Sequence, residues 1–255
     1  MLMPITNWNE KTKIAIPGNA EETLKFCALH FIKAYQKAVQ EKGSFQVALS
    51  GGSTPKALFS LLTKQPYSLE IDWSKVHLFW SDERSVGPEN SESNYHMAME
   101  AGFSLVNIPP VQIHRMIAED SIEKNALDYE NLLKKDVSLG FDYLMLGMGE
   151  DGHTASLFPG TTGLHIADRW VIANYIPQKN TWRMTLTFTC INQAKNIVIY
   201  VLGKAKQEKT IEIFSSKEAL FPIQNVGSQE HPALWIMDNE AAPSIIRNTI
   251  NNLNS

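Results

Sequence analysis

The chain contains little cysteine, and its two residues, Cys27 and Cys190, lie far apart. A disulfide framework or a zinc site of the Cys-x-x-Cys type needs closely spaced pairs, and the sequence has no His-Glu-x-x-His motif either. Cys27 falls on the apolar face of a helical pattern, which favours a buried thiol. We therefore expect a protein of a reducing compartment, without a disulfide framework and without a metal site.

Long apolar runs and an excess of one charge are also missing. No run approaches the roughly 20 residues that a membrane-spanning helix needs, and the N-terminal stretch MLMPITNWNEKTK lacks a secretory profile. The 23 Lys and Arg residues against 27 Asp and Glu give a net charge of -4. This balance excludes a broad basic footprint for nucleic acid or membrane, although an anion can still bind locally. We expect a cytoplasmic protein, monomeric or weakly homo-oligomeric, whose partner is a small molecule.

Apolar strand patterns alternate with amphipathic helical patterns along the 255 residues. This alternation predicts a mostly parallel α/β sheet with helices on both faces, in a single domain spanning residues 1–255. No helical pattern separates the strands at 169–176 and 183–189, so this pair is expected to form a small antiparallel excursion. The remaining predicted strands lie at 46–50, 75–81, 141–147, 196–203 and 233–238. The predicted helices lie at 20–42, from 56, from 94, at 121–137, at 204–216 and at 241–252.

Ligands of open α/β sheets bind beyond the carboxyl ends of the strands, and four such ends carry unusual residues. The first is SGGSTP, residues 50–55. Its glycines let the backbone approach a ligand, and we expect Thr54 to cap a helix that begins at Pro55. The free N–H groups at such a helix start favour an anion, especially phosphate. An ordinary capped turn is the alternative.

The second end is SDER, residues 81–84, where two acids and an arginine follow an apolar strand. Arg84 could donate a fork of hydrogen bonds to phosphate while its acidic neighbours orient it. A solvated loop with local ion pairs is the alternative.

The third end is GMGEDGHTAS, residues 147–156. Three glycines permit a tight approach to a ligand, and they set His153 just past a buried strand. The imidazole is suited to general-base chemistry near neutral pH, and Asp151 could orient the ring or tune its pKa. A purely structural histidine is the alternative, which the Gly-Asp-Gly-His setting disfavours.

The fourth end is GKAK, residues 203–206, where Lys204 or Lys206 could reach an anion. Surface solvation is the alternative for both lysines. No Gly-x-Ser-x-Gly elbow is present, so the sequence does not support a serine nucleophile.

These segments together resemble the glucosamine-6-phosphate isomerase/6-phosphogluconolactonase superfamily over almost the whole chain. The turn continues as GHTASLFPG, where the deaminase branch typically reads GHIAFNEP, and SDER stands where that branch has a motif like DEY; both differences favour the lactonase branch. The matching motifs are LSGGSTPKALF (49–59), WSDERSVGPENSESNY (80–95), LGMGEDGHTASLFPG (146–160) and RMTLTFTCINQAKNIVIYVLGKAK (183–206).

The resemblance implies a fold like that of ribose-5-phosphate isomerase and glucosamine-6-phosphate deaminase. It also implies hydrolysis of 6-phospho-D-glucono-1,5-lactone in the oxidative pentose phosphate pathway, without a cofactor. A deaminating isomerase of amino-sugar phosphates and a non-catalytic sugar-phosphate sensor remain the alternatives. Carried onto this chain, the implied roles are a catalytic base at His153, an orienting acid at Asp151, a phosphate cradle at Gly51, Gly52, Ser53 and Thr54, phosphate contacts from Arg84 and Lys206, and a pocket-lining Arg183.

Overall fold

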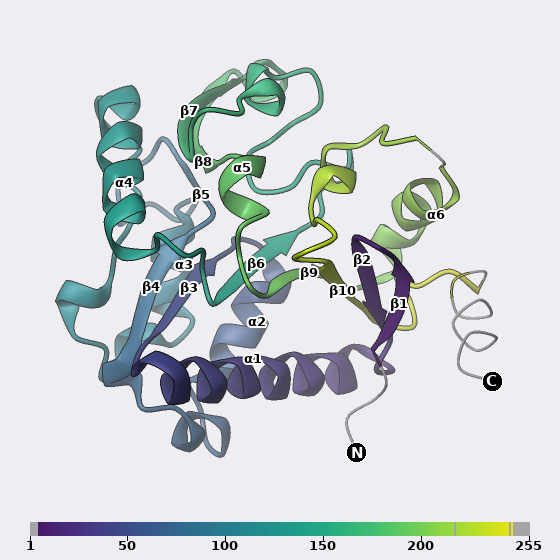
Figure 1. Ribbon diagram of the computed structural model, residues 1–255, viewed down its shortest axis with the longest axis horizontal. Helices are drawn as coiled ribbons and strands as arrows, with labels where there is room; N and C mark the ends of the chain where they lie inside the picture. The colour runs from purple at the N-terminus through teal and green to yellow at the C-terminus, as the bar shows by residue number, and fades with distance from the viewer. Residues whose placement is uncertain (1–4, 217, 245, 247–255) are drawn as a thin grey trace.

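The computed structural model describes residues 5–216, 218–244 and 246. Within them, seven strands form one sheet that is parallel throughout except at β1, which pairs antiparallel with β2 (Figure 1). In spatial order the strands are β1 (Thr6–Asn9), β2 (Thr12–Ala15), β10 (Ala233–Met237), β9 (Ile197–Val201), β6 (Tyr143–Gly147), β3 (Phe45–Leu49) and β4 (Val76–Trp80).

A second sheet holds three antiparallel strands in the order β5 (Asp82–Arg84), β8 (Thr181–Leu186) and β7 (Val171–Ile176). It lies above the main sheet in the view of Figure 1, and α4 packs beside it. The predicted antiparallel excursion is therefore confirmed. The prediction of a strand as far as residue 189 is wrong, because Thr187 caps the short helix α5 by accepting a hydrogen bond from the Cys190 N–H.

Helices flank both faces of the main sheet. Phe31 of α1 packs edge-on against Phe45 and Tyr143, whereas Phe214 of α6 packs on Trp235. Side chains alternate along a strand, so the strand register directs Trp235 to the face opposite Phe45 and Tyr143. The helices are α1 (Ala20–Lys42), α2 (Ser53–Leu62), α3 (Asn94–Glu100), α4 (Ile122–Asp136), α5 (Phe188–Ile191) and α6 (Gln207–Ser215). The 3-10 turns are η1 (Tyr67–Glu70), η2 (Trp73–Lys75), η3 (Phe103–Leu105), η4 (Pro110–Gln112), η5 (Thr162–His165), η6 (Pro177–Lys179), η7 (Lys204–Lys206) and η8 (Pro222–Asn225).

The longest helix, α1, follows its sequence signals closely. Asn19 and Glu22 form a reciprocal capping box at its start, and Gly43 ends it in the left-handed region at a φ of 79°. Cys27 lies fully buried on its apolar face, as predicted. Most of the predicted C-terminal helix, 241–252, lies outside the described residues.

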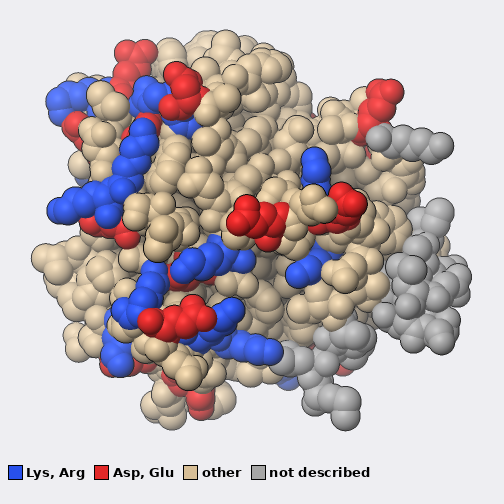
Figure 2. Space-filling view, viewed as in Figure 1, with Lys and Arg blue, Asp and Glu red and all other residues tan. Residues whose placement is uncertain are grey.

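The edge hairpin of β1 and β2 was not predicted, because its short strands carry few apolar residues. Among the described residues, no helix is both long and apolar enough to cross a membrane. On the face shown in Figure 2, basic and acidic side chains lie interspersed, in agreement with the mild net charge.

Candidate active site

A cleft of about 180 Å³ opens where β3, β5 and β6 end. It brings together the first three of the four strand ends that the sequence singled out. Its lining consists of Ser50, Gly51, Gly52, Asp82, Arg84, Asn94, Gly147, Met148, Gly149, His153, Ala155 and Arg183.

The glycine turn after β3 leads directly into α2. The helix begins at Ser53, with Gly52 as its N-cap at a φ of 107°, so the prediction that Thr54 caps the helix is wrong. Glycine tolerates this positive φ, and the chain therefore enters the helix earlier than a threonine cap would allow. No side chain caps α2, and Pro55 has no N–H group, so the backbone N–H groups of Ser53 and Thr54 are the ones at the helix start available for an anion.

The strand β5 directs Arg84 into the cleft. A buried carboxylate, that of Glu83, accepts hydrogen bonds from the backbone N–H groups of Arg84, Asn94 and Tyr95 and from the Ser93 hydroxyl. Burial raises the pKa of Glu83, against the effect of these four hydrogen bonds. Glu83 thus ties the segment that carries Arg84 to the start of α3.

Arg183 lies directly opposite Arg84 in the β5–β8 register, so both guanidinium groups reach the same cleft. The Nε atoms of both arginines are buried and have no hydrogen-bond partner among the described residues. Burial lowers the pKa of Arg183, while the nearby carboxylate of Asp82 acts in the opposite direction. The cleft therefore holds two cationic groups, each with a buried Nε–H that no described residue engages.

Two polar residues of the cleft were not among the predicted site residues, although Asp82 was expected to help orient Arg84. Asp82, which is 5% exposed, accepts a hydrogen bond of 2.7 Å from the Ser156 hydroxyl through Oδ2. Asn94 donates its side-chain amide to the Asp82 carbonyl at 2.9 Å. The only sequence signal for Asp82 was its place in SDER. Asn94 was marked only as a predicted helix start, and its place in the cleft depends on packing between separate segments.

His153 and Asp151 form a hydrogen-bonded pair, with 2.5 Å between Nδ1 and Oδ1. A carboxylate can only accept, so Nδ1 carries the proton of a neutral ring and Nε2 keeps its lone pair. Burial lowers the pKa of His153, although the negative charges of Asp151 and Asp82 oppose this effect. Burial alone would raise the pKa of Asp151, but the hydrogen bond and the charge of His153 lower it on balance. The site thus holds a neutral imidazole near pH 7.

Gly149 explains why this turn needs a residue without a side chain. A Cβ atom at this position would lie 2.0 Å from Nδ1 of His153 and would displace the ring. The backbone N–H groups of Gly149 and Gly152 donate to carbonyls within the turn, those of His153 and Gly149 respectively. These two groups are therefore already engaged.

The two candidate lysines differ in position. Lys206 donates from Nζ to the carbonyl of Met148, a cleft residue, at 2.8 Å. Lys204 instead bonds to Gln207 at the surface. Of the pair, Lys206 lies closer to the cleft, while its contact with phosphate stays a prediction.

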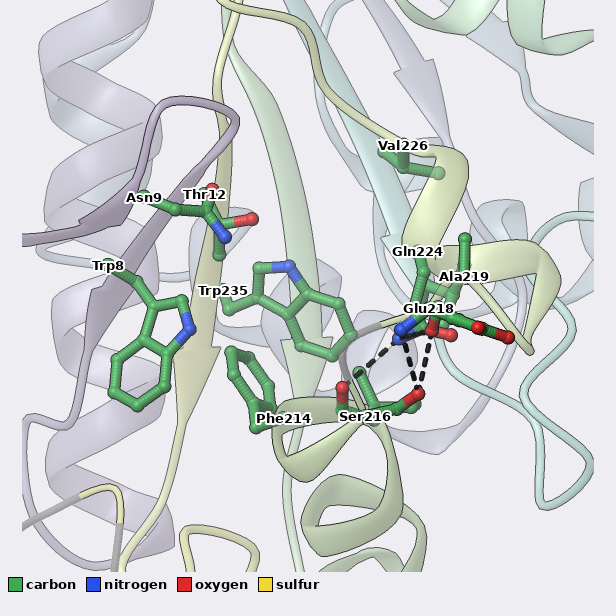
Figure 3. Close-up of a pocket in the computed structure, with 12 residues that line it drawn as sticks. Trp8, Asn9, Thr12, Phe214, Ser216, Glu218, Ala219, Gln224, Val226 and Trp235 are labelled. Carbon is green, nitrogen blue, oxygen red and sulfur yellow. Dashed lines mark hydrogen bonds between the residues drawn. The ribbon is translucent and has the colours of Figure 1, made fainter.

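A second hollow, of about 210 Å³, lies near the edge of the main sheet that β1 and β2 form, between β1, β10, α6 and η8. Its aromatic residues are Trp8, Phe214 and Trp235, and none of the predicted site residues lines it (Figure 3). Among the described residues, no cluster of three or more His, Cys, Asp or Glu is arranged to hold a metal ion. The cleft at the strand ends is therefore the candidate active site.

Comparison with known proteins gives a consistent result. A family model described as glucosamine-6-phosphate isomerases/6-phosphogluconolactonase matches residues 18–235. A 6-phosphogluconolactonase of Chlamydia muridarum is 39% identical over 234 residues, which span 91% of this chain and 90% of that protein. One of Synechocystis is 38% identical over 219 residues, spanning 82% and 88%. The solved structure of a 6-phosphogluconolactonase from Thermotoga maritima has a TM-score of 0.77 at 29% identity and covers 90% of this chain and 100% of that one. The chain belongs to the glucosamine-6-phosphate isomerase/6-phosphogluconolactonase family.

Proposed function

We propose that this protein hydrolyses 6-phospho-D-glucono-1,5-lactone to 6-phosphogluconate, the second step of the oxidative pentose phosphate pathway, with His153 as the general base. The observation that carries this proposal is the Asp151–His153 pair in a cleft that also holds two guanidinium groups and an uncapped helix start. The relatives named above bear the name of this activity.

The phosphate end of the substrate would bind at the first turn of α2. There, Gly51, Gly52, Ser53 and Thr54 supply backbone and hydroxyl donors, and the helix dipole adds a favourable field. Arg84 and Lys206 supply positive charge from the neighbouring strand ends. Binding energy at this remote end would hold the reacting carbonyl beside His153.

Hydrolysis begins when Nε2 of His153 takes a proton from a water molecule as the water oxygen attacks C1. The C1–O bond to water forms, and negative charge collects on the carbonyl oxygen. Collapse then breaks the bond from C1 to the ring oxygen, and the imidazolium returns its proton to that oxygen. Asp151 holds the ring in the tautomer that these proton transfers need, and it stabilises the imidazolium that forms.

Arg183 is the group that we assign to the developing oxyanion. The N–H groups of Gly149 and Gly152 are engaged within their turn, whereas Arg183 has an unused Nε and lies close enough to His153 to affect its pKa. A fixed cation aimed at developing charge is worth several kcal/mol in a water-poor site.

The test is a coupled assay with freshly generated lactone, run on the wild-type protein and on His153→Gln. We expect rapid turnover by the wild type and a fall in kcat of at least about a hundredfold in the variant, with a much smaller change in KM. Ammonia release from glucosamine 6-phosphate is measured alongside. Ammonia release without lactone hydrolysis would point to the deaminase branch, and binding without turnover would point to a sensor. A variant that keeps full kcat would remove His153 from the mechanism.

A further inference from the structure

The ring of Phe158 lies flat against the imidazole of His153. The two ring centroids are 3.8 Å apart and the planes differ by 16°. Phe158 is 1% exposed, and it was not among the residues that the sequence marked for function. A buried ring in this position can control how the proposed base is oriented.

The chain reaches this contact by reversing its direction between the two residues. The Leu157 N–H donates to the Thr154 carbonyl at 2.9 Å, and Ala155 adopts a φ of 46° in the turn. A left-handed alanine is strained, so the surrounding structure must hold this turn in place. Thr161 then fixes the far side, because both its N–H and its hydroxyl donate to the Phe158 carbonyl. The position of Phe158 is thus set by its backbone as well as by its packing.

The guanidinium of Arg183 also contacts this ring, with Cζ 5.4 Å from the ring centroid. Phe158 therefore touches both the proposed base and the proposed oxyanion-stabilising cation. Cation–π contacts of this kind favour one placement of the guanidinium over the face of the ring.

We propose that Phe158 is a positioning residue, which fixes the plane of the His153 imidazole and the place of the Arg183 guanidinium so that Nε2 meets the attacking water. The proposal rests on the proposed role of His153. The hydrogen bond to Asp151 restrains Nδ1, but coupled changes in the two side-chain torsions of His153 can still tilt the ring plane. The stacked face of Phe158 opposes that tilt.

Phe158 also keeps water from one face of the imidazole. The charged groups that act on this ring are Asp151 from its own turn, Asp82 from β5 and Arg183 from β8. Burial lowers the pKa of His153 against the two carboxylates. Loss of the aromatic ring would admit water and would therefore move this pKa upward, toward its ordinary value.

The test replaces the ring by a flexible side chain of similar volume, in Phe158→Met. Phe103→Met is the matched control, because Phe103 is also 1% exposed but packs on Phe59 and Trp73, among residues that do not line the cleft. We expect kcat of Phe158→Met to fall about tenfold to a hundredfold, and the acidic limb of the kcat/KM profile to move to higher pH. Phe103→Met should keep the wild-type kcat and profile.

A second readout does not depend on activity. The His153 imidazole is titrated by ¹⁵N NMR, with its signal assigned from its absence in His153→Gln. We expect a higher pKa in Phe158→Met than in the wild type or in Phe103→Met. If Phe158→Met does not fold, Phe158→Leu takes its place with the same two readouts.

A kcat and a titration equal to those of the Phe103 control would overturn the proposal. If His153→Gln keeps full activity while the imidazole titration still responds to Phe158, the assigned role of His153 has failed rather than the contact. The activity of His153→Gln tests the role of His153, and the imidazole titration tests the contact with Phe158, so failure of one proposal can be told from failure of the other.

Discussion

Glu83 gives the most direct test of how the cleft is built. In Glu83→Gln the side chain keeps its shape, but its NH₂ group replaces one carboxylate oxygen. In the wild type each carboxylate oxygen accepts two hydrogen bonds: Oε1 from the N–H groups of Arg84 and Asn94, and Oε2 from the Ser93 hydroxyl and the Tyr95 N–H. The glutamine side chain can accept hydrogen bonds only at its one oxygen. At the other position its NH₂ group faces two donors and can accept neither hydrogen bond.

The magnitude follows from these contacts. Two hydrogen bonds to a charged acceptor are lost, each worth about 1.5–3 kcal/mol, while removing a buried charge recovers part of that. We expect a net loss of about 3 kcal/mol in the free energy of unfolding, measured by urea denaturation at pH 7. The kcat/KM for the lactone should fall as well, because the segment carrying Arg84 loses its tie to α3.

Glu89→Gln is the matched control, since it makes the same chemical change at an exposed position of the loop that follows β5. It should stay within about 0.5 kcal/mol of the wild type. A Glu83→Gln protein as stable and as active as this control would refute the idea that the buried carboxylate organises the arginine segment.

Two further predictions concern recognition of the substrate phosphate and the stability of the folded protein at acidic pH. Arg84→Gln should raise KM for the phosphorylated lactone and weaken competition by inorganic phosphate, each by about tenfold or more, while leaving an unphosphorylated gluconolactone almost unaffected; steady-state kinetics with both substrates checks this, and equal losses on both would exclude phosphate recognition by Arg84. Burial, helped by the charge of Lys33, lowers the pKa of His30 from 6.5 to about 4. The unfolded chain therefore binds the extra proton first on acidification, so the stability contributed by neutral His30 is complete above about pH 6.5 and is lost as the pH falls toward 4. At pH 5 the loss should be about 2 kcal/mol, and His30→Gln should lack this part of the acid dependence in urea unfolding at pH 7.5 and pH 5; an unchanged pH dependence in the variant would contradict the shift.

Much of this architecture could be predicted from local patterns. The capping box and the apolar stripe of α1 act within a few residues of each other, so sequence alone locates that helix and buries Cys27. The strand ends were found for a similar reason, because glycine, acidic and basic residues break apolar runs abruptly. The Asp151–His153 contact joins residues two positions apart, and local chemistry was enough to indicate it.

Other features depended on contacts between distant segments. SDER was interpreted as the end of a strand, yet Asp82–Arg84 forms a strand of its own and pairs with β8, about one hundred residues later. This pairing sets Arg84 opposite Arg183. The prediction of Thr54 as the N-cap was wrong for a local reason. Gly52 and Thr54 both suit a helix start, and only the path of the backbone selects between them.

The sequence alone determined which residues stand at the strand ends and which chemistry they carry, because those signals are local in the chain. The tertiary structure decided which of them face one another: the paired arginines, the Glu83 anchor and the ring of Phe158 on the imidazole. Strand register and side-chain packing are set by the whole core at once, and no short stretch of residues encodes them.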